Sequence, residues 1–171
     1  KEHIGKNTLQ LATKGIASNL KSFGGNETPW PEMQADKAIS WAEGQISKQL
    51  SAEQRSAVET ALQSKMLLLK TSPGVDCSPS IDVLLRILKA KGVTSLIATP
   101  TASGATALMD QIEGDADSVL NMLDWKAKTG KFKHNAKKPL DCSLLVIKDA
   151  HKIGPHLMLA VLQALPKEAA L

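Results

Sequence analysis

The first part of the chain contains two stretches in which apolar residues recur at the spacing of an amphipathic helix. The first is residues 7–23, and its apolar positions are Leu9, Ile16, Leu20 and Phe23. Gly24-Gly25 is expected to end this helix, and the prolines of residues 26–31 (NETPWP) predict a linker. Residues 32–49 predict a second helix, in which Trp41 is expected to pack in the core against a neighbouring helix.

From Leu50 onwards, helical patterns alternate with short apolar runs. Ser51 and Gln54 form the sequence pattern of a capping box, which predicts the start of a helix. Three apolar runs predict buried strands at residues 66–69, 94–99 and 143–147. Helices are predicted at residues 81–90, 102–112, 117–123 and 157–165. Apolar strands that alternate with helices indicate an α/β fold with a parallel sheet covered on both faces.

The length and composition fit one globular domain with an appendage. The 171 residues are 43% hydrophobic, and no apolar run approaches the roughly 18 residues of a membrane span. We expect a helical lead-in at residues 1–49 and one α/β subdomain at residues 50–171. The chain starts at Lys1 without a secretory signal pattern, so it is expected to be a piece of a longer cytoplasmic polypeptide. Cys77 and Cys142 are too few for a disulfide framework and are expected to be reduced.

The net charge of +4 is concentrated in one segment that contains no acidic residue between Asp124 and Asp141. Its basic residues are Lys126, Lys128, Lys131, Lys133, Lys137 and Lys138. The rest of the chain has 15 basic residues against 17 acidic ones. The planar side chains of Trp125, Phe132 and His134 lie in or beside the same segment. Rings among lysines are suited to single-stranded nucleic acid, because bases stack on rings and phosphates meet ammonium groups. The alternative is a solvated hairpin that only keeps the protein soluble.

Five segments between residues 50 and 166 follow one another in a recognisable order. They are LSAEQRSAV (50–58), KMLLLKTSPGVDCSPSIDVLLRIL (65–88), ATPTASGATAL (98–108), GKFKHNAKKPLDCSLLVIKDAH (130–151) and GPHLMLAVLQALP (154–166). Their order and spacing resemble those of RecD-like superfamily-one DNA helicases. The resemblance implies a partial RecA-like (P-loop NTPase-like) sheet. It also implies that Gln54 contacts adenine and that Thr99 and Thr101 belong to a motif that binds single-stranded DNA. A strand-to-helix turn capped by Thr101 is the alternative interpretation of that motif.

The nucleotide-binding motifs depart from this family. The first motif of the family has the pattern Gly-x-x-x-x-Gly-Lys-Thr. In this chain Thr71 stands in place of the first glycine, Asp76 in place of the second glycine and Cys77 in place of the lysine. Gly74 remains within the loop, and Ser78 keeps the hydroxyl that would bind magnesium. The Asp-Glu pair of the second motif falls on Lys148 and Asp149. We therefore expect a degenerate nucleotide site with no catalytic residue, no cofactor and no metal.

The sequence argues against a thiol nucleophile, against a pair of histidine metal ligands and against one of the DNA contacts of the family. Cys77 has no predictable His or Asn partner, and Asp76 beside it would raise its thiol pKa, which disfavours a nucleophilic role. His151 and His156 lack the spacing of a helical metal pair and are expected at the surface. The family's Thr-x-His motif falls on residues 118–120, where the histidine is replaced by leucine.

A vestigial RecD-like region is typical of the relaxase–helicases of F-type conjugative plasmids. The resemblance thus implies a non-catalytic subdomain that binds single-stranded DNA, inside a bacterial cytoplasmic protein that nicks and unwinds plasmid DNA. Its partners would be the adjacent relaxase and active helicase, and components of a type IV secretion system, with no membrane insertion. The alternative is a protein-interaction domain, which an exposed apolar patch at Trp30, Met33 or Trp41 would favour. Residual nucleotide binding through Gln54 and Ser78 is a third possibility.

Overall fold

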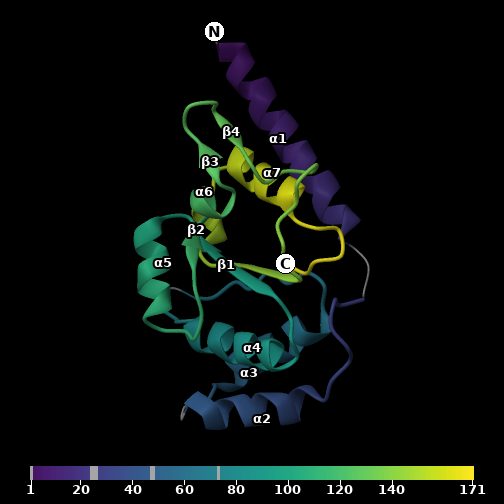
Figure 1. The fold of residues 1–171 in the computed structure, drawn as a ribbon, viewed down its shortest axis with the longest axis vertical. Coiled ribbons are helices and arrows are strands. Elements are labelled where there is room, and N and C mark those ends of the chain that lie inside the picture. Colours follow the sequence, from purple (N-terminus) through teal and green to yellow (C-terminus); the bar gives the residue numbers. More distant parts are fainter. Residues whose placement is uncertain (1, 24–26, 47–48, 73) are drawn as a thin grey trace.

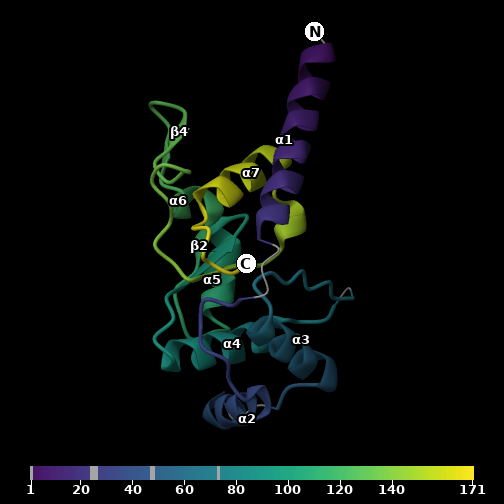
Figure 2. The same cartoon turned by 90° about the vertical axis from the view of Figure 1, so that its right-hand side faces the viewer.

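A computed structural model describes residues 2–23, 27–46, 49–72 and 74–171. The helices are α1 (Glu2–Ser22), α2 (Ala35–Ile46), α3 (Ala52–Gln63), α4 (Ser78–Ala90), α5 (Ala102–Met109), α6 (Val119–Met122) and α7 (Pro155–Ala164), with a 3-10 turn η1 (Ala150–Lys152). The strands are β1 (Ser95–Thr99), β2 (Asp117–Ser118), β3 (Trp125–Lys126), β4 (Lys131–Phe132) and β5 (Leu144–Ile147). Figure 1 and Figure 2 show their arrangement.

The centre of the fold is a three-stranded parallel sheet with the order β2-β1-β5. Ser95 lies opposite Leu144, and the two strands stay in register until Ala98 meets Ile147. These two strands confirm the predictions at residues 94–99 and 143–147, and the α/β fold class is confirmed with them. The short strand β2 was not predicted, because residues 117–118 were assigned to the start of the helix that follows.

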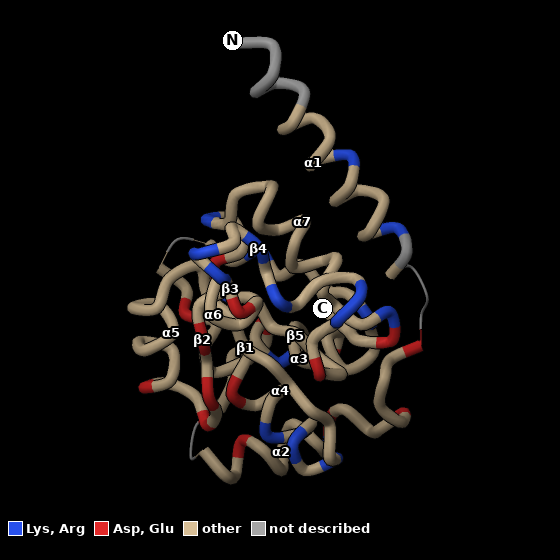
Figure 3. The backbone as a smooth tube through the Cα atoms, turned by 45° about the horizontal axis from the view of Figure 1, so that its top comes forward, with Lys and Arg blue, Asp and Glu red and all other residues tan. Residues whose placement is uncertain are grey.

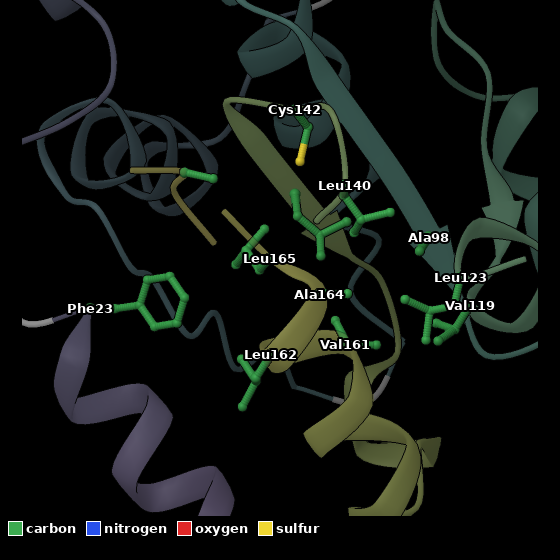
Figure 4. Packing of buried hydrophobic residues seen from close by; sticks show 12 residues of the cluster. Phe23, Ala98, Val119, Leu123, Leu140, Cys142, Val161, Leu162, Ala164 and Leu165 are labelled. Carbon is green, nitrogen blue, oxygen red and sulfur yellow. The ribbon is translucent and has the colours of Figure 1, made fainter. Parts of the chain in front are cut away.

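Helices cover both faces of the sheet, so neighbouring residues of β5 enter different cores. Leu145 packs with residues of α1 and α7, while Leu144 packs with α2, α3 and α4. In Figure 1 the first group lies above the sheet and the second group below it. Figure 4 shows this first core from close by, with Phe23, Leu162 and Leu165 among the side chains of the cluster. Helix α4 is buried along almost its whole length, as expected for a helix between a sheet and further helices.

The prediction of a buried strand at residues 66–69 is wrong. The segment forms no strand, and Leu68 is 82% exposed. Within the part of the chain that the structure describes, its backbone pairs with the last residue: Leu67 N–H donates to the Leu171 carbonyl, and Leu171 N–H donates to the Lys65 carbonyl, both at 2.9 Å. Ala170 in turn pairs with β5. An apolar run becomes a buried strand only when strands and helices cover it, and here the run lies beyond the covered sheet.

The N-terminal predictions are confirmed in part. Helix α1 and the Ser51–Gln54 capping box are present, whereas Gly24-Gly25 lies outside the described residues. Trp41 is not a core residue, since it is 48% exposed. Helix α2 packs through Ile39 and Ala42, and a residue next to Ala42 is turned about 100° away around the helix. The linker residue Trp30 is buried instead, and its indole N–H donates to the Leu62 carbonyl at 2.9 Å.

Candidate functional site

The residues that correspond to the two nucleotide motifs meet at the N-terminus of α4. Lys148, which directly follows β5, donates from Nζ to Ser78 Oγ at 2.8 Å. The same ammonium lies 3.9 Å from Asp76 Oδ1. Asp76 Oδ1 also accepts the backbone N–H of Ser78 at 2.9 Å. The fold thus brings three of the residues predicted for the degenerate nucleotide site, Asp76, Ser78 and Lys148, into contact with one another.

Two internal charges occupy this site. The Asp76 carboxylate accepts a donor at the N-terminus of α4, where a P-loop would hold a phosphate oxygen. The Lys148 ammonium lies against the Ser78 hydroxyl, where a P-loop would hold magnesium. Ser78 is 1% exposed, so this hydroxyl depends on Lys148 as its hydrogen-bond partner. The side chains thus reproduce the charge pattern of a phosphate and a cation.

The side chain of Gln54 is also used within the protein. Its Nε2 donates to the Asp76 carbonyl at 3.0 Å, and its Oε1 accepts the Ser51 N–H at 2.9 Å. Both ends of the amide therefore have partners that fix the loop to the start of α3. Gly74, in the same loop, has a φ of 85°, a conformation that glycine adopts without strain.

Asp149 and the two thiols lie at the edges of this site. Asp149 has a left-handed backbone (φ 59°) and accepts from Lys152 Nζ at 2.9 Å. That hydrogen bond is the main reason why the pKa of Asp149 is lowered. Burial raises the pKa of the Cys77 thiol, with Lys148 opposing the effect. Burial also raises the pKa of Cys142 to about 11, so neither environment activates a thiol.

The predicted DNA motif after β1 forms a tightly packed turn. The buried Thr99 donates from Oγ1 to the Thr101 carbonyl at 2.7 Å. Thr101 Oγ1 accepts the Gly104 N–H at 3.1 Å and caps α5. The sequence did not predict a role for Gly104 in this turn. A Cβ at this position would lie 3.1 Å from Thr101 Oγ1 and 3.2 Å from Thr99 Oγ1, so a larger residue would crowd both hydroxyls. Thr101 itself is exposed at this turn, whereas Thr99 is buried.

The basic segment forms a projecting antiparallel hairpin, which we call the basic hairpin (residues 125–138). Trp125 pairs with Phe132 across β3 and β4. Their ring centroids lie 4.7 Å apart at 52°, and Trp125 stays 40% exposed. Gly130, with a φ of 61°, allows the turn between the strands. The hairpin follows α6, which begins beside Thr99 at the carboxyl end of β1.

The six lysines of the basic hairpin fall into two groups. Lys126 and Lys133 bind the two carboxylate oxygens of Asp124 at 2.6 and 3.0 Å. These hydrogen bonds hold the pKa of Asp124 below its usual range. Within the described residues, the other four have no carboxylate within 4.0 Å; they are Lys128, Lys131, Lys137 and Lys138. Figure 3 shows the blue segments that mark Lys and Arg around β3 and β4.

The remaining candidates have simple local environments. His134 Nδ1 lies 3.2 Å from the Pro139 carbonyl, which fixes its ring at the base of the hairpin. His151 and His156 are exposed, as predicted. Among the described residues, no group of three or more His, Cys, Asp or Glu side chains is placed to hold a metal ion. The described helices include none that is long and apolar enough to cross a membrane.

Comparison with known proteins places this architecture in a family. The chain is similar to the ATP-dependent RecD2 DNA helicase of Deinococcus radiodurans, with 26% identity over 122 residues. The alignment covers 71% of this chain and 17% of the helicase, so the chain spans less than a fifth of that relative. Residues 54–171 match the family model of the AAA domain, AAA_19. The match includes the sheet, the contact between Lys148 and Ser78 and the basic hairpin, and the chain therefore belongs to this AAA domain family as a RecD2-like, helicase-related member.

Proposed function

We propose that this domain binds single-stranded DNA without hydrolysing ATP. The observation that carries the proposal is the basic hairpin, which combines four exposed lysines, without carboxylate partners among the described residues, with a partly exposed indole. Lysines attract the phosphates of a strand, and an exposed ring offers a surface for one base. The similarity to a DNA helicase supports DNA as the polyanion.

The geometry of the hairpin favours a single strand over a duplex. Phe132 packs against Trp125 and supports it from within the hairpin, so that the indole can stack with an unpaired base. Bases of a duplex are already stacked on each other and are not available to a side chain at this position. The lysines contact phosphates without reading sequence, so we expect little sequence preference.

Binding of labelled single- and double-stranded oligonucleotides, measured by fluorescence anisotropy at several salt concentrations, tests this proposal. We expect the single strand to bind more tightly. A variant with Lys128, Lys131, Lys137 and Lys138 changed to Ala should reduce the slope of log affinity against log salt by about 3 units, at about 0.7 per phosphate contact. Lys14, Lys21, Lys70 and Lys167 are exposed lysines elsewhere, and changing them to Ala provides a control of equal net charge. Equal affinities for the hairpin variant and the control would refute the proposal.

The absence of ATP hydrolysis is the second part of the proposal. Asp76 would repel the triphosphate, and Lys148 would compete with magnesium at Ser78. Gln54 would have to break two hydrogen bonds to contact adenine. We expect no binding of a fluorescent ATP analogue with magnesium. Micromolar affinity would instead support the residual nucleotide-binding function.

We also propose that the parent polypeptide is a conjugative relaxase–helicase. The support is the order of motifs in the sequence, together with the similarity to RecD2. In that setting the domain would hold the single strand beside the relaxase and the active helicase, and would contact type IV secretion components. Deleting residues 50–171 from the parent is expected to lower plasmid transfer while nicking at the transfer origin continues. Unchanged transfer would contradict this assignment.

A further inference from the structure

A pocket of about 380 Å³ lies between α2 and the C-terminal end of α4. Its lining includes Met33, Lys37, Trp41, Ile87, Ala90 and Lys91. In Figure 1, α2 lies at the bottom of the molecule and the basic hairpin at the top. The pocket is therefore separate from the site proposed for DNA.

The pocket presents apolar surface that the fold leaves in contact with water. Ile87 is a buried residue of the α4 core and also borders the pocket. The half-exposed indole of Trp41 borders it from α2. A partly exposed tryptophan beside a pocket is a typical anchor of protein interfaces, because covering it removes a large apolar area from water.

The rim of the pocket is positively charged. Lys37 and Lys91 are exposed, and neither has a carboxylate within 4.0 Å in the part of the chain that the structure describes. The nearby carboxylates of α2 are engaged elsewhere, since Asp36 and Glu43 bind Arg55. Lys37 and Trp41 are one helical turn apart, so a ligand in the pocket can meet both.

We propose that this pocket binds an acidic, amphipathic segment of a partner protein. One large apolar side chain of the segment packs against Trp41 and Ile87, and its neighbouring carboxylates meet Lys37 and Lys91. An apolar side chain fits the lining better than a nucleobase, because the polar edges of a base need hydrogen-bond partners when buried. Apart from the two lysines and the indole of Trp41, Gln34 is the residue of this lining whose side chain could hydrogen-bond to the polar edge of a base. This proposal does not depend on DNA binding by the hairpin.

A displayed library of random peptides about 12 residues long, which allows about three helical turns, tests the proposal on the full chain. Peptides that bind are expected to combine a large apolar residue with neighbouring Asp or Glu. The Trp41→Ala variant should lose at least about tenfold in affinity for them. The Trp125→Ala variant is the matched control, since it removes the partly exposed indole of the basic hairpin, and its affinity should be unchanged.

The charge requirement has its own test. The double variant Lys37→Glu/Lys91→Glu should weaken the selected peptides by about tenfold or more, and salt should weaken them in the wild type. Thermal melting checks that each variant folds, which is expected because the changed side chains are exposed. The proposal fails if no peptide prefers the wild type over Trp41→Ala, or if the selected peptides are basic. It also fails if Trp41→Ala reduces oligonucleotide affinity in place of peptide affinity.

Discussion

The contact between Lys148 and the buried Ser78 makes a quantitative prediction for Lys148→Met. This change removes the ammonium that binds Ser78 Oγ at 2.8 Å and leaves a hydroxyl that is 1% exposed without its partner. A hydrogen bond to a charged group contributes about 1.5–3 kcal/mol. The ion pair with Asp76 adds at most about 1 kcal/mol, because at 3.9 Å and 56% exposure of the carboxylate it is weakened by solvent. We expect a loss of about 2–3 kcal/mol.

Thermal and urea unfolding, followed by circular dichroism, measure this loss. For a domain of this size, about 1 kcal/mol corresponds to roughly 2–4 °C, so the melting temperature should fall by roughly 5–10 °C. Lys152→Met is the matched control, because Lys152 donates to Asp149 at the similar distance of 2.9 Å but in an exposed pair. The control is expected to lose about 0–1 kcal/mol.

A double-mutant cycle with Ser78→Ala shows whether the hydrogen bond itself is responsible. Ser78→Ala alone should cost less than Lys148→Met, because the Lys148 side chain is 22% exposed and its ammonium can turn to water. The double variant leaves no buried hydroxyl unpaired, so we expect a coupling of about 1–2 kcal/mol. Additive effects, or a Lys148→Met loss no larger than that of Lys152→Met, would refute the role given to Lys148.

Two further predictions concern the hairpin and the thiols. Asp124→Asn should release Lys126 and Lys133, and single-stranded DNA should then bind more tightly and with a steeper salt dependence. Asparagine is the suitable replacement, because it tolerates the left-handed backbone of this position (φ 51°). Because the pKa of Asp124 is lowered, acidification should narrow the difference in affinity between the wild type and Asp124→Asn only below the usual pH range of an Asp carboxyl; a difference that already narrows at pH 5–6, where the carboxyl is still ionised, would contradict the pairing. Alkylation by iodoacetamide should label Cys77 before Cys142, whose pKa of about 11 and burial keep it protonated at neutral pH. Labelling of Cys142 should rise as the pH approaches that value, and equal rates for the two thiols at pH 7 would contradict their environments.

The sequence predicted those parts of the fold in which a local pattern and the tertiary structure agree. The two strands β1 and β5 are apolar and covered on both faces, so the apolar runs were sufficient. Residues 66–69 have the same pattern, but burial there depends on covering elements that no local pattern reveals. Trp41 shows the same limit within a helix, because periodicity does not state which of two adjacent residues faces the neighbour.

The sequence predicts which residues belong to the candidate site better than it predicts the hydrogen bonds and ion pairs between them. The order of the motifs assigns Asp76, Ser78 and Lys148 to one site, and the structure brings these three residues into contact. The hydrogen bond between Lys148 and Ser78 spans 70 positions and depends on the sheet, so spacing could not predict it. The neutralising role of Asp124 was likewise missed, since the residue had marked only the boundary of the basic segment.

The backbone pairing at the sheet edge has a consequence for the order of folding. Leu67 N–H donates to the Leu171 carbonyl and Leu171 N–H donates to the Lys65 carbonyl, although Leu171 is about a hundred residues away from both, and closing so long a loop has a large entropic cost. We therefore expect this edge to form after β1 has paired with both its neighbours. In the native protein the same edge should open first. Amide hydrogens of Leu67 and Leu171 should exchange with solvent faster than those of β1, and slower exchange there would place the edge among the earliest structure.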